Sequence, residues 1–356
     1  MSLNHAQTEA VAHNKGPCMV LAGPGSGKTL TIAKRIEYLI MKHKVRPEEI
    51  LVITFTKYAA WEMKNRTRSI CGPSSYAVTF GTFHGIYYGI LKWAYRLNQS
   101  NLLSDEEKYR ILREILPGID WDQEPEADEE KDYLQELAIE IGNVKNNCMD
   151  IEEYEPVKYT TEKFRKLYRT YEETKKKYRK IDFEDMLIQC RDLFMKRPDI
   201  LKKWQEKFQY ILVDEFQDVN QAQYDVVRML AAPQDNLFVV GDDDQSVYGF
   251  RGAKPGIMME FMKDYPKARQ ILLDVNYRSS GYIVKGALRV IGNNKIRFEK
   301  KIEAFRKPDE TVHVQEVKDP VQEAEYVLER IREYREKGVS YTDCLLYTSP
   351  SPRDCS

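Results

Sequence analysis

A lysine and a threonine follow three closely spaced glycines near the start of the chain, in the stretch Met19-Val-Leu-Ala-Gly-Pro-Gly-Ser-Gly-Lys-Thr29. Glycines allow successive backbone N–H groups to point at one place, and the helix predicted to begin there adds its positive end. We therefore predict a phosphate-binding loop. In it Lys28 contacts the β- and γ-phosphates of ATP, and the Thr29 hydroxyl ligates Mg²⁺.

The predicted nucleotide contacts of this loop are Ala22, Gly23, Pro24, Gly25, Ser26, Gly27, Lys28 and Thr29. The strict pattern G-x-x-x-x-G-K-[ST] has glycine where this chain has Ala22. A glycine-rich turn that binds nothing is the alternative. The order of apolar run, glycine-rich loop, Lys-Thr and helical pattern favours the phosphate site.

Two carboxylates stand at the end of an apolar run, where Asp214 and Glu215 follow Tyr210-Ile-Leu-Val213. In an open α/β sheet, ligands bind beyond the carboxyl ends of the strands. We predict that Asp214 holds Mg²⁺ together with Thr29 and that Glu215 is the base that activates water. The alternative is a pair of acidic residues that only caps the strand in solvent.

Three further polar residues are predicted to complete this site. Gln245 follows an apolar run at 236–242 and suits hydrogen bonds to the γ-phosphate; Arg278 follows a run at 270–276 and suits transition-state charge. Gln7 precedes the loop by some twenty residues. Its amide both donates and accepts hydrogen bonds, so we expect it to contact the adenine edge.

Apolar runs and helical patterns alternate along much of the chain, which predicts an α/β fold with a parallel sheet and right-handed crossovers. The expected strands include 50–55, 77–80, 210–213, 236–242 and 270–276. From about 97 to 180 the sequence is charged and helical in period, which predicts an inserted helical subdomain. Its acidic stretch (124–132) and basic stretch (163–180) are either solvated helix faces or, for the basic one, phosphate contacts.

The composition excludes some classes of protein. The 356 residues are 42% apolar and 31% charged with a net charge of −1, so any nucleic-acid site is a local groove on an otherwise balanced surface. The six cysteines form no C-x-x-C pair, which indicates reduced thiols and a cytoplasmic location. The start has no signal-peptide pattern, and no apolar run approaches membrane-spanning length.

Eight stretches in order resemble the amino-terminal part of superfamily 1 DNA helicases of the UvrD/Rep/PcrA type. They lie between residue 3 and about residue 280. Two of them are highly specific for this family: Val213-Asp-Glu-Phe-Gln-Asp218 and the stretch that begins Gly241-Asp-Asp-Asp-Gln-Ser246. The eight are the Gln7 segment, 22–29, 53–56 with 59–60, 82–84, 182–185, 213–218, 241–253 and 276–279.

The resemblance implies an ATP-driven motor that moves 3′ to 5′ on single-stranded DNA and acts at junctions with duplex, in repair, replication or recombination. It implies that Tyr277 stacks on adenine. It also implies DNA contacts by Phe55, Thr82, His84, Tyr248 and Phe250, and aromatic faces do grip bases without sequence preference. For Phe55 the alternative is packing in the core. The chain departs from the family at Lys57, Tyr58 and Leu30.

The implied fold is a RecA-like P-loop sheet with helices on both faces. The expected divisions are a RecA-like ATPase domain at 1–97 and 181–275, the helical insert at 98–180, an incomplete second RecA-like domain at 276–343, and a tail at 344–356. In the second domain we expect a strand at 311–317 and a helix at 321–337. The tail switches abruptly to turn-forming residues, and we interpret it as non-native, a translated sequencing adapter.

Two functions remain open from the sequence. In the first, the chain is the front half of a helicase, or of a helicase-nuclease. In the second, it is a nucleotide- and DNA-binding module without unwinding activity. Protein partners and oligomeric state are not indicated by any pattern.

Overall fold

The computed structural model describes residues 3–119, 130–246, 256–295, 297–307, 312–344 and 346. The chain divides into two units, Met1–Asp309 and Glu310–Ser356, and each is described by itself. In the described ranges no helix has the length and apolar character needed to cross a membrane.

A six-stranded sheet forms the centre of the first unit, with the strand order β3-β2-β4-β5-β1-β6. All of its neighbouring strands are parallel. The predicted α/β fold with a parallel sheet is therefore confirmed. The strands are β1 (Cys18–Ala22), β2 (Ile50–Thr54), β3 (Thr79–Thr82), β4 (Tyr210–Val213), β5 (Leu237–Gly241) and β6 (Arg269–Leu273).

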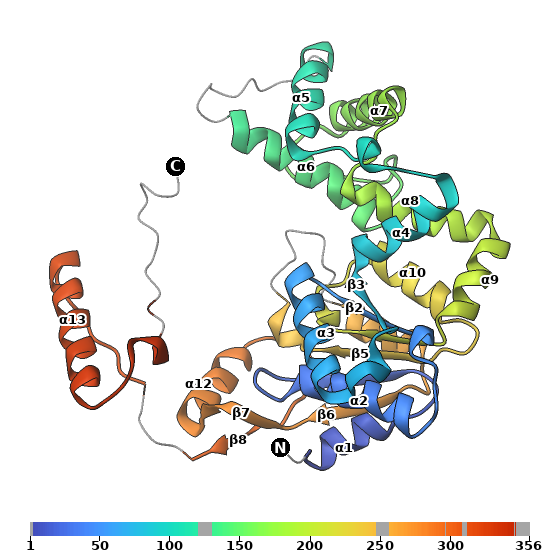
Figure 1. The fold of residues 1–356 in the computed structure, drawn as a ribbon. Coiled ribbons are helices and arrows are strands. Elements are labelled where there is room, and N and C mark those ends of the chain that lie inside the picture. Colours follow the sequence, from blue (N-terminus) through green and yellow to red (C-terminus); the bar gives the residue numbers. More distant parts are fainter. Residues whose placement is uncertain are drawn as a thin grey trace. The chain divides into compact units, whose positions relative to one another are not determined.

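Helices cover both faces of this sheet, as Figure 1 shows. Alternate residues of each central strand belong to different cores, so that Met19 and Leu21 pack on one face and Val20 on the other. Continuous apolar strands are required because a parallel sheet is buried on both sides. One face carries α1 (His5–Ala12), α2 (Lys28–Met41) and α3 (Lys57–Cys71); the other carries α4 (Phe83–Tyr95), α8 (Phe183–Lys196), α9 (Pro198–Lys207), α10 (Gln221–Ala231) and α11 (Ile257–Asp264).

The loop after β1 lies between the ends of two neighbouring strands, because β1 pairs with β5 on one side and with β6 on the other. In the β1–β6 pair, Ala22 is opposite Leu273. The single strand expected at 270–276 is two strands. Asp274 separates β6 from β7 (Val275–Ser280), which pairs with β8 (Glu303–Arg306) in a second, two-stranded sheet; α12 (Gly281–Ile291) lies between them in the chain.

The segment predicted as a helical insert contains three long helices with a core of their own. They are α5 (Asp105–Ile115), α6 (Glu130–Asn146) and α7 (Thr161–Tyr178). An isolated bridge between Leu102 and Ile181 brings the two ends of the insert together. Most of the predicted acidic stretch lies outside the described residues.

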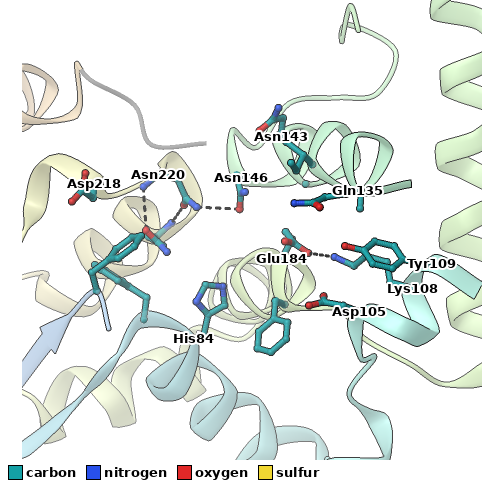
Figure 2. Close-up of a pocket in the computed structure, with 17 residues that line it drawn as sticks. His84, Asp105, Lys108, Tyr109, Gln135, Asn143, Asn146, Glu184, Asp218 and Asn220 are labelled. Carbon is teal, nitrogen blue, oxygen red and sulfur yellow. Dashed lines mark hydrogen bonds and ion pairs between the residues drawn. The ribbon is translucent and has the colours of Figure 1, made fainter. Parts of the chain in front are cut away.

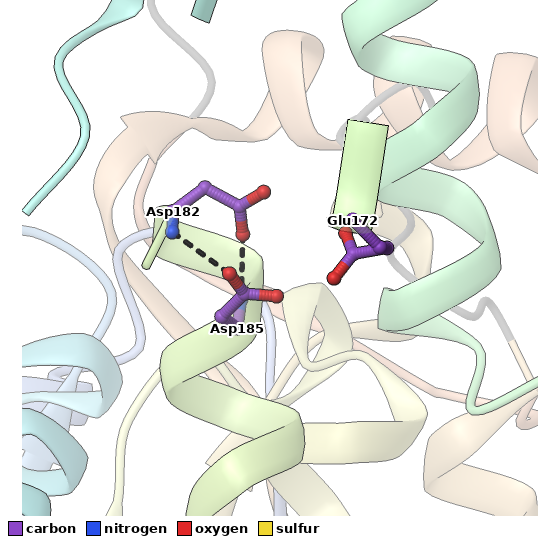
Figure 3. Close-up of side chains that lie close together, drawn as sticks. All are labelled: Glu172, Asp182 and Asp185. Carbon is purple, nitrogen blue, oxygen red and sulfur yellow. Dashed lines mark hydrogen bonds between the residues drawn. The ribbon is translucent and has the colours of Figure 1, made fainter. Parts of the chain in front are cut away.

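A buried cluster of charges joins α6 and α7 to the start of α8. Lys145 and Lys175 each donate to both Asp182 and Asp185, at 2.5 to 2.8 Å, and each contacts Glu172. The three carboxylates converge in Figure 3. Removing one partner of such a buried cluster leaves an uncompensated charge, which costs about 3–5 kcal/mol. Lys175 of the basic stretch is neither on a solvated helix face nor free to contact phosphate, because its side chain is buried in this cluster.

The second unit contains α13 (Pro320–Glu336), close to the helix predicted at 321–337. The strand expected at 311–317 is wrong, since residues 312–317 have no regular structure. Val314 is 92% exposed there. A strand needs a partner for its backbone N–H and C=O groups, and alternating valines alone do not supply one.

Candidate functional site

The loop after β1 requires glycine at two positions with left-handed backbone, Gly25 (φ +67°) and Gly27 (φ +84°). A Cβ atom at Gly25 would lie 2.6 Å from the Cβ of Arg278, and one at Gly27 would lie 2.7 Å from Gln7 Nε2. Other parts of the chain therefore pack directly on the loop backbone. The loop is fixed further by the Ser26 hydroxyl, which donates to the Gly23 carbonyl at 2.7 Å.

Gln7 is buried against the backbone of this loop at Ser26 and Gly27. Its Nε2 donates to the Ser26 carbonyl at 2.9 Å, and its Oε1 accepts from the backbone N–H of Asn4 at 3.0 Å. The Asn4 amide donates in turn to the Tyr277 hydroxyl at 2.9 Å. Gln7 and Tyr277, both predicted to contact adenine, are thus joined through one residue.

Lys28 begins α2 and is paired with Glu215. Its Nζ donates to Glu215 Oε2 at 2.7 Å, across 187 residues of sequence. Burial alone would raise the pKa of Glu215, but the Lys28 ammonium and the Gln217 amide outweigh burial and lower that pKa below its ordinary value. The carboxylate is therefore ionised at neutral pH.

Glu215 has a strained backbone, because its φ of +50° lies in the left-handed region. Such a conformation costs a non-glycine residue on the order of 1 kcal/mol or more. The turn directs the Glu215 side chain from the end of β4 toward Lys28. Gln217, two residues later, donates to Glu215 Oε2 at 3.0 Å.

Asp214 directly follows β4 and is almost fully buried. Burial, followed by the neighbouring Glu215 carboxylate, raises the pKa of Asp214 to about 6. Its Oδ1 accepts from the backbone N–H of Glu215 at 3.0 Å. Of the two predicted Mg²⁺ ligands, Thr29 directly follows Lys28 as the second residue of α2, and Asp214 directly precedes Glu215, the partner of Lys28.

Gln245, predicted to contact the γ-phosphate, and Arg278, predicted to supply transition-state charge, come after β5 and β6, the two strands that flank β1. Gln245 comes after β5, and its Nε2 donates to Asp242 Oδ2 at 2.6 Å. After β6, Asn276 donates to the Pro24 carbonyl at 2.8 Å and the Tyr277 N–H donates to the Gly25 carbonyl at 2.9 Å. These two bonds hold Arg278, whose side chain is exposed, against the loop.

A second feature of the first unit is a cavity of about 560 Å³ between the sheet edge and the insert, shown in Figure 2. Phe55, His84 and Phe183 line it, and the rings of His84 and Phe183 meet edge to face at 5.8 Å. Burial lowers the pKa of His84. Lys108 and Glu184 form an ion pair at 3.0 Å on the side of the insert.

The predicted DNA contacts are only partly gathered at this cavity. Phe55 and His84 line it, so Phe55 lies outside the buried cores. Thr82 stands at the start of α4, where its hydroxyl accepts from the Gly85 N–H at 3.2 Å. Tyr248 and Phe250 lie outside the described residues.

Comparison with known proteins identifies the family. The profile described as "UvrD/REP helicase N-terminal domain" matches residues 3–266, and that described as "UvrD-like helicase C-terminal domain" matches 271–351. The chain belongs to the UvrD/REP helicase family. The resemblance found in the sequence motifs is thereby confirmed.

Relatives in the UvrD/REP family are similar over nearly all of this chain. YjcD of Bacillus subtilis (strain 168) is 39% identical over 99% of the chain and 46% of its own length. The ATP-dependent DNA helicase PcrA of Staphylococcus aureus (strain Mu50) is 35% identical, over 97% and 47%. DNA helicase II of Escherichia coli (strain K12) is 34% identical, over 98% and 48%. The chain thus spans about half the length of these relatives.

The structure also shows residues that the sequence analysis of this UvrD/REP chain did not single out. Gln217 and Asp242 lie in the two most specific stretches, and Phe183 lies in the stretch 182–185, so motif membership was a signal for all three. Gln217 joins the ends of β4 and β5, since its Oε1 accepts from the Asp242 N–H at 2.9 Å. Gly241 allows this close approach: a Cβ there would lie 2.8 Å from Gln217 Oε1.

Proposed function

We propose that this chain is the ATP-binding and ATP-hydrolysing front part of a 3′ to 5′ DNA helicase or translocase. The observation that carries the proposal is the 2.7 Å contact between Lys28 and Glu215 at the glycine-rich loop. It brings together the lysine that we propose binds the phosphates and the carboxylate that we propose is the base, as phosphoryl transfer requires. The ATP-dependent DNA helicases among the relatives support the same reaction class.

Lys28 and Glu215 act in sequence in this proposal. Incoming β- and γ-phosphates compete with Glu215 for the Lys28 ammonium, because a phosphate carries more negative charge than one carboxylate. Glu215, released from Lys28 and ionised, then accepts a proton from the attacking water. Gln245 hydrogen-bonds the γ-phosphate, and Arg278 offsets the charge that develops on it.

The residues Thr29 and Asp214 fit Mg²⁺, since a hydroxyl and a carboxylate are oxygen ligands of the kind that this ion prefers. Bound with ATP, the ion would neutralise charge on the phosphates. Gln7 and Tyr277 are proposed to hold adenine. The backbone of Ala22, Gly23, Pro24, Gly25, Ser26 and Gly27 is proposed to cradle the phosphates.

Single-stranded DNA is proposed to cross the cavity of Figure 2. Phe55 and His84 line this cavity, and we propose that their rings stack on bases. Thr82, at the start of α4 and two residues before His84, is proposed to contact the same strand. We extend this DNA track to Tyr248 and Phe250 from the family resemblance. The proposed substrates include junctions of single- and double-stranded DNA, and the proposed location is the cytoplasm.

The proposed domains are an ATPase domain at 1–97 and 181–275, a helical insert at 98–180, and the start of a second RecA-like domain at 276–343. The separate core of α5 to α7 supports the insert. The two family profiles meet between residues 266 and 271, close to the proposed start of the second RecA-like domain at 276, and this supports a domain boundary in that region. The C-terminal profile continues to residue 351, into the stretch 344–356 that we interpreted as a non-native tail.

The proposal is tested by binding and strand displacement. The 356-residue chain should bind a fluorescent ATP analogue in the presence of Mg²⁺, and it should bind oligo-dT in preference to blunt duplex, as measured by anisotropy. Strand displacement with the full-length protein should require a single-stranded 3′ tail. Displacement from 5′-tailed substrate only would contradict the direction, and binding without any displacement would favour a binding module.

The pKa of Asp214 predicts how Mg²⁺ binding depends on pH. Above about pH 6 the carboxylate is ionised and holds the cation; below it a proton competes. At pH 5.5 about a quarter of the Asp214 carboxyls are ionised, so the Mg²⁺ concentration for half-maximal binding of the analogue should rise about fourfold relative to pH 7.5.

Two variants separate this effect from protonation of the nucleotide itself. Asp214→Asn should lose the part of the pH dependence that the protein contributes. Asp218→Asn should keep it, although burial also raises the pKa of Asp218 to about 6. An identical pH dependence in Asp214→Asn and the parent chain would remove Asp214 from the Mg²⁺ site.

A further inference from the structure

Three consecutive aspartates after β5 converge on one buried lysine. Lys300 Nζ donates to Asp242 at 2.5 Å, to Asp243 at 2.6 Å, and lies 2.7 Å from an Asp244 oxygen. The side chain of Lys300 is fully inaccessible to solvent. Three carboxylates this close together suit a divalent cation, but here the ammonium group occupies their centre.

The chain around Lys300 reinforces these contacts. Arg297 forms a two-bond pair with Asp244, at 2.8 and 2.6 Å, and the Phe298 N–H donates to Asp243 Oδ2 at 2.8 Å. Residues 297–300 follow α12 and therefore belong to the chain beyond β7. They are held to the loop after β5 by charges of opposite sign, mostly shielded from water.

Asp242 is the member of this cluster that reaches the nucleotide site. One of its oxygens accepts from Lys300, and the other accepts from Gln245 Nε2 at 2.6 Å. Its backbone N–H donates to Gln217, whose amide donates to Glu215. A continuous series of hydrogen bonds thus runs from Lys300 to the candidate base and on to Lys28.

We propose that Lys300 is a positioning residue for ATP hydrolysis: by holding Asp242 it fixes Gln245 toward the phosphate loop and supports Gln217 against Glu215. This inference rests on the proposed ATPase function. The physical reason is geometric. Asp242 without Lys300 would lie among two other carboxylates that repel it, and the Gln245 amide would lose its fixed acceptor.

Rate and affinity must be separated to test this role. We would measure kcat for Mg²⁺-ATP hydrolysis and the Kd of a fluorescent ATP analogue for the parent chain, Lys300→Met, Lys300→Arg and Lys301→Met. Lys300→Met should lower kcat tenfold or more while the Kd changes less than twofold, since neither Lys28 nor the loop is altered. Lys300→Arg should recover part of the rate. Lys301, exposed beside Lys300, is the matched control and should leave both values unchanged.

The outcomes distinguish the positioning role of Lys300 from the proposed ATPase function on which it rests. A parent chain that neither binds nor hydrolyses ATP contradicts both. A parental kcat in Lys300→Met, or a loss of affinity as large as the loss of rate, overturns the positioning role alone. If Lys300→Met does not fold, Asp243→Asn decides: it removes one acceptor of Lys300 without touching Asp242 or Gln245. A severalfold lower kcat at unchanged Kd supports the role, and an unchanged kcat overturns it.

Discussion

Replacing Lys28 with alanine is expected to abolish ATP binding by this chain. The ammonium group is the cation that the proposed site aims at the β- and γ-phosphates, and Glu215 already holds it at 2.7 Å from its carboxylate. A charged hydrogen bond of this kind contributes about 1.5–3 kcal/mol, and two of them together exceed a hundredfold in Kd. Titration with a fluorescent ATP analogue measures the loss directly.

Lys34→Ala is the matched control, because Lys34 lies on the same helix and forms only a partly exposed pair with Glu37. That variant should bind the analogue like the parent chain. Exposed pairs contribute about 0–1 kcal/mol, so its stability should also change little. Equal affinity in Lys28→Ala and Lys34→Ala would mean that the phosphates bind elsewhere.

Glu215→Gln is expected to separate binding from turnover. Glutamine keeps the size of the side chain and bears the left-handed backbone no worse than glutamate, but it cannot accept the proton of the attacking water. Loss of a general base lowers the rate by about 10²–10⁴. In a single-turnover experiment the variant should therefore bind ATP and leave it unhydrolysed over many parental half-lives.

The comparison variant is Glu206→Gln, an exposed glutamate on α9. It should hydrolyse ATP at the parental rate. ATP affinity in Glu215→Gln should equal or exceed the parental value, since the carboxylate that competes for Lys28 has been neutralised. Normal hydrolysis by Glu215→Gln would exclude Glu215 as the base.

The part of the fold that carries the proposed nucleotide site was predictable because each of its strands has a local apolar pattern. Buried parallel strands must be apolar throughout, so the runs at 50–55 and 210–213 were visible in the sequence, and both strands form. Asp214 and Glu215 follow the strand at 210–213, and Lys28 follows β1 after the glycine-rich loop. Since parallel strands end at the same edge, their proximity was a direct consequence of the topology.

The contacts that were not predictable depend on distant partners. Nothing around Lys300 indicates that three aspartates some 57 residues earlier surround it. The alternating valines near 312–317 had a strand pattern, yet the described residues there form no strand. Lys175 belongs to a basic stretch that suggested solvent or phosphate, but carboxylates of its own chain surround it. In each case the structure of the segment or the burial of the side chain depends on whether residues distant in the sequence pair with it, and the local pattern does not show this.

The register between β1 and β6 determines which residues after these two strands lie opposite each other at the proposed nucleotide site. Because Ala22 is opposite Leu273, Gly25 and Tyr277 are reached after nearly the same length of chain, and the bond between their backbones forms there. Deleting one residue between 274 and 276 would shift everything after it by about 3.3 Å and reverse which side each side chain faces. Arg278 would then turn away from the loop, although no residue of the site had been replaced. This short segment should therefore tolerate changes of residue type far better than changes of length.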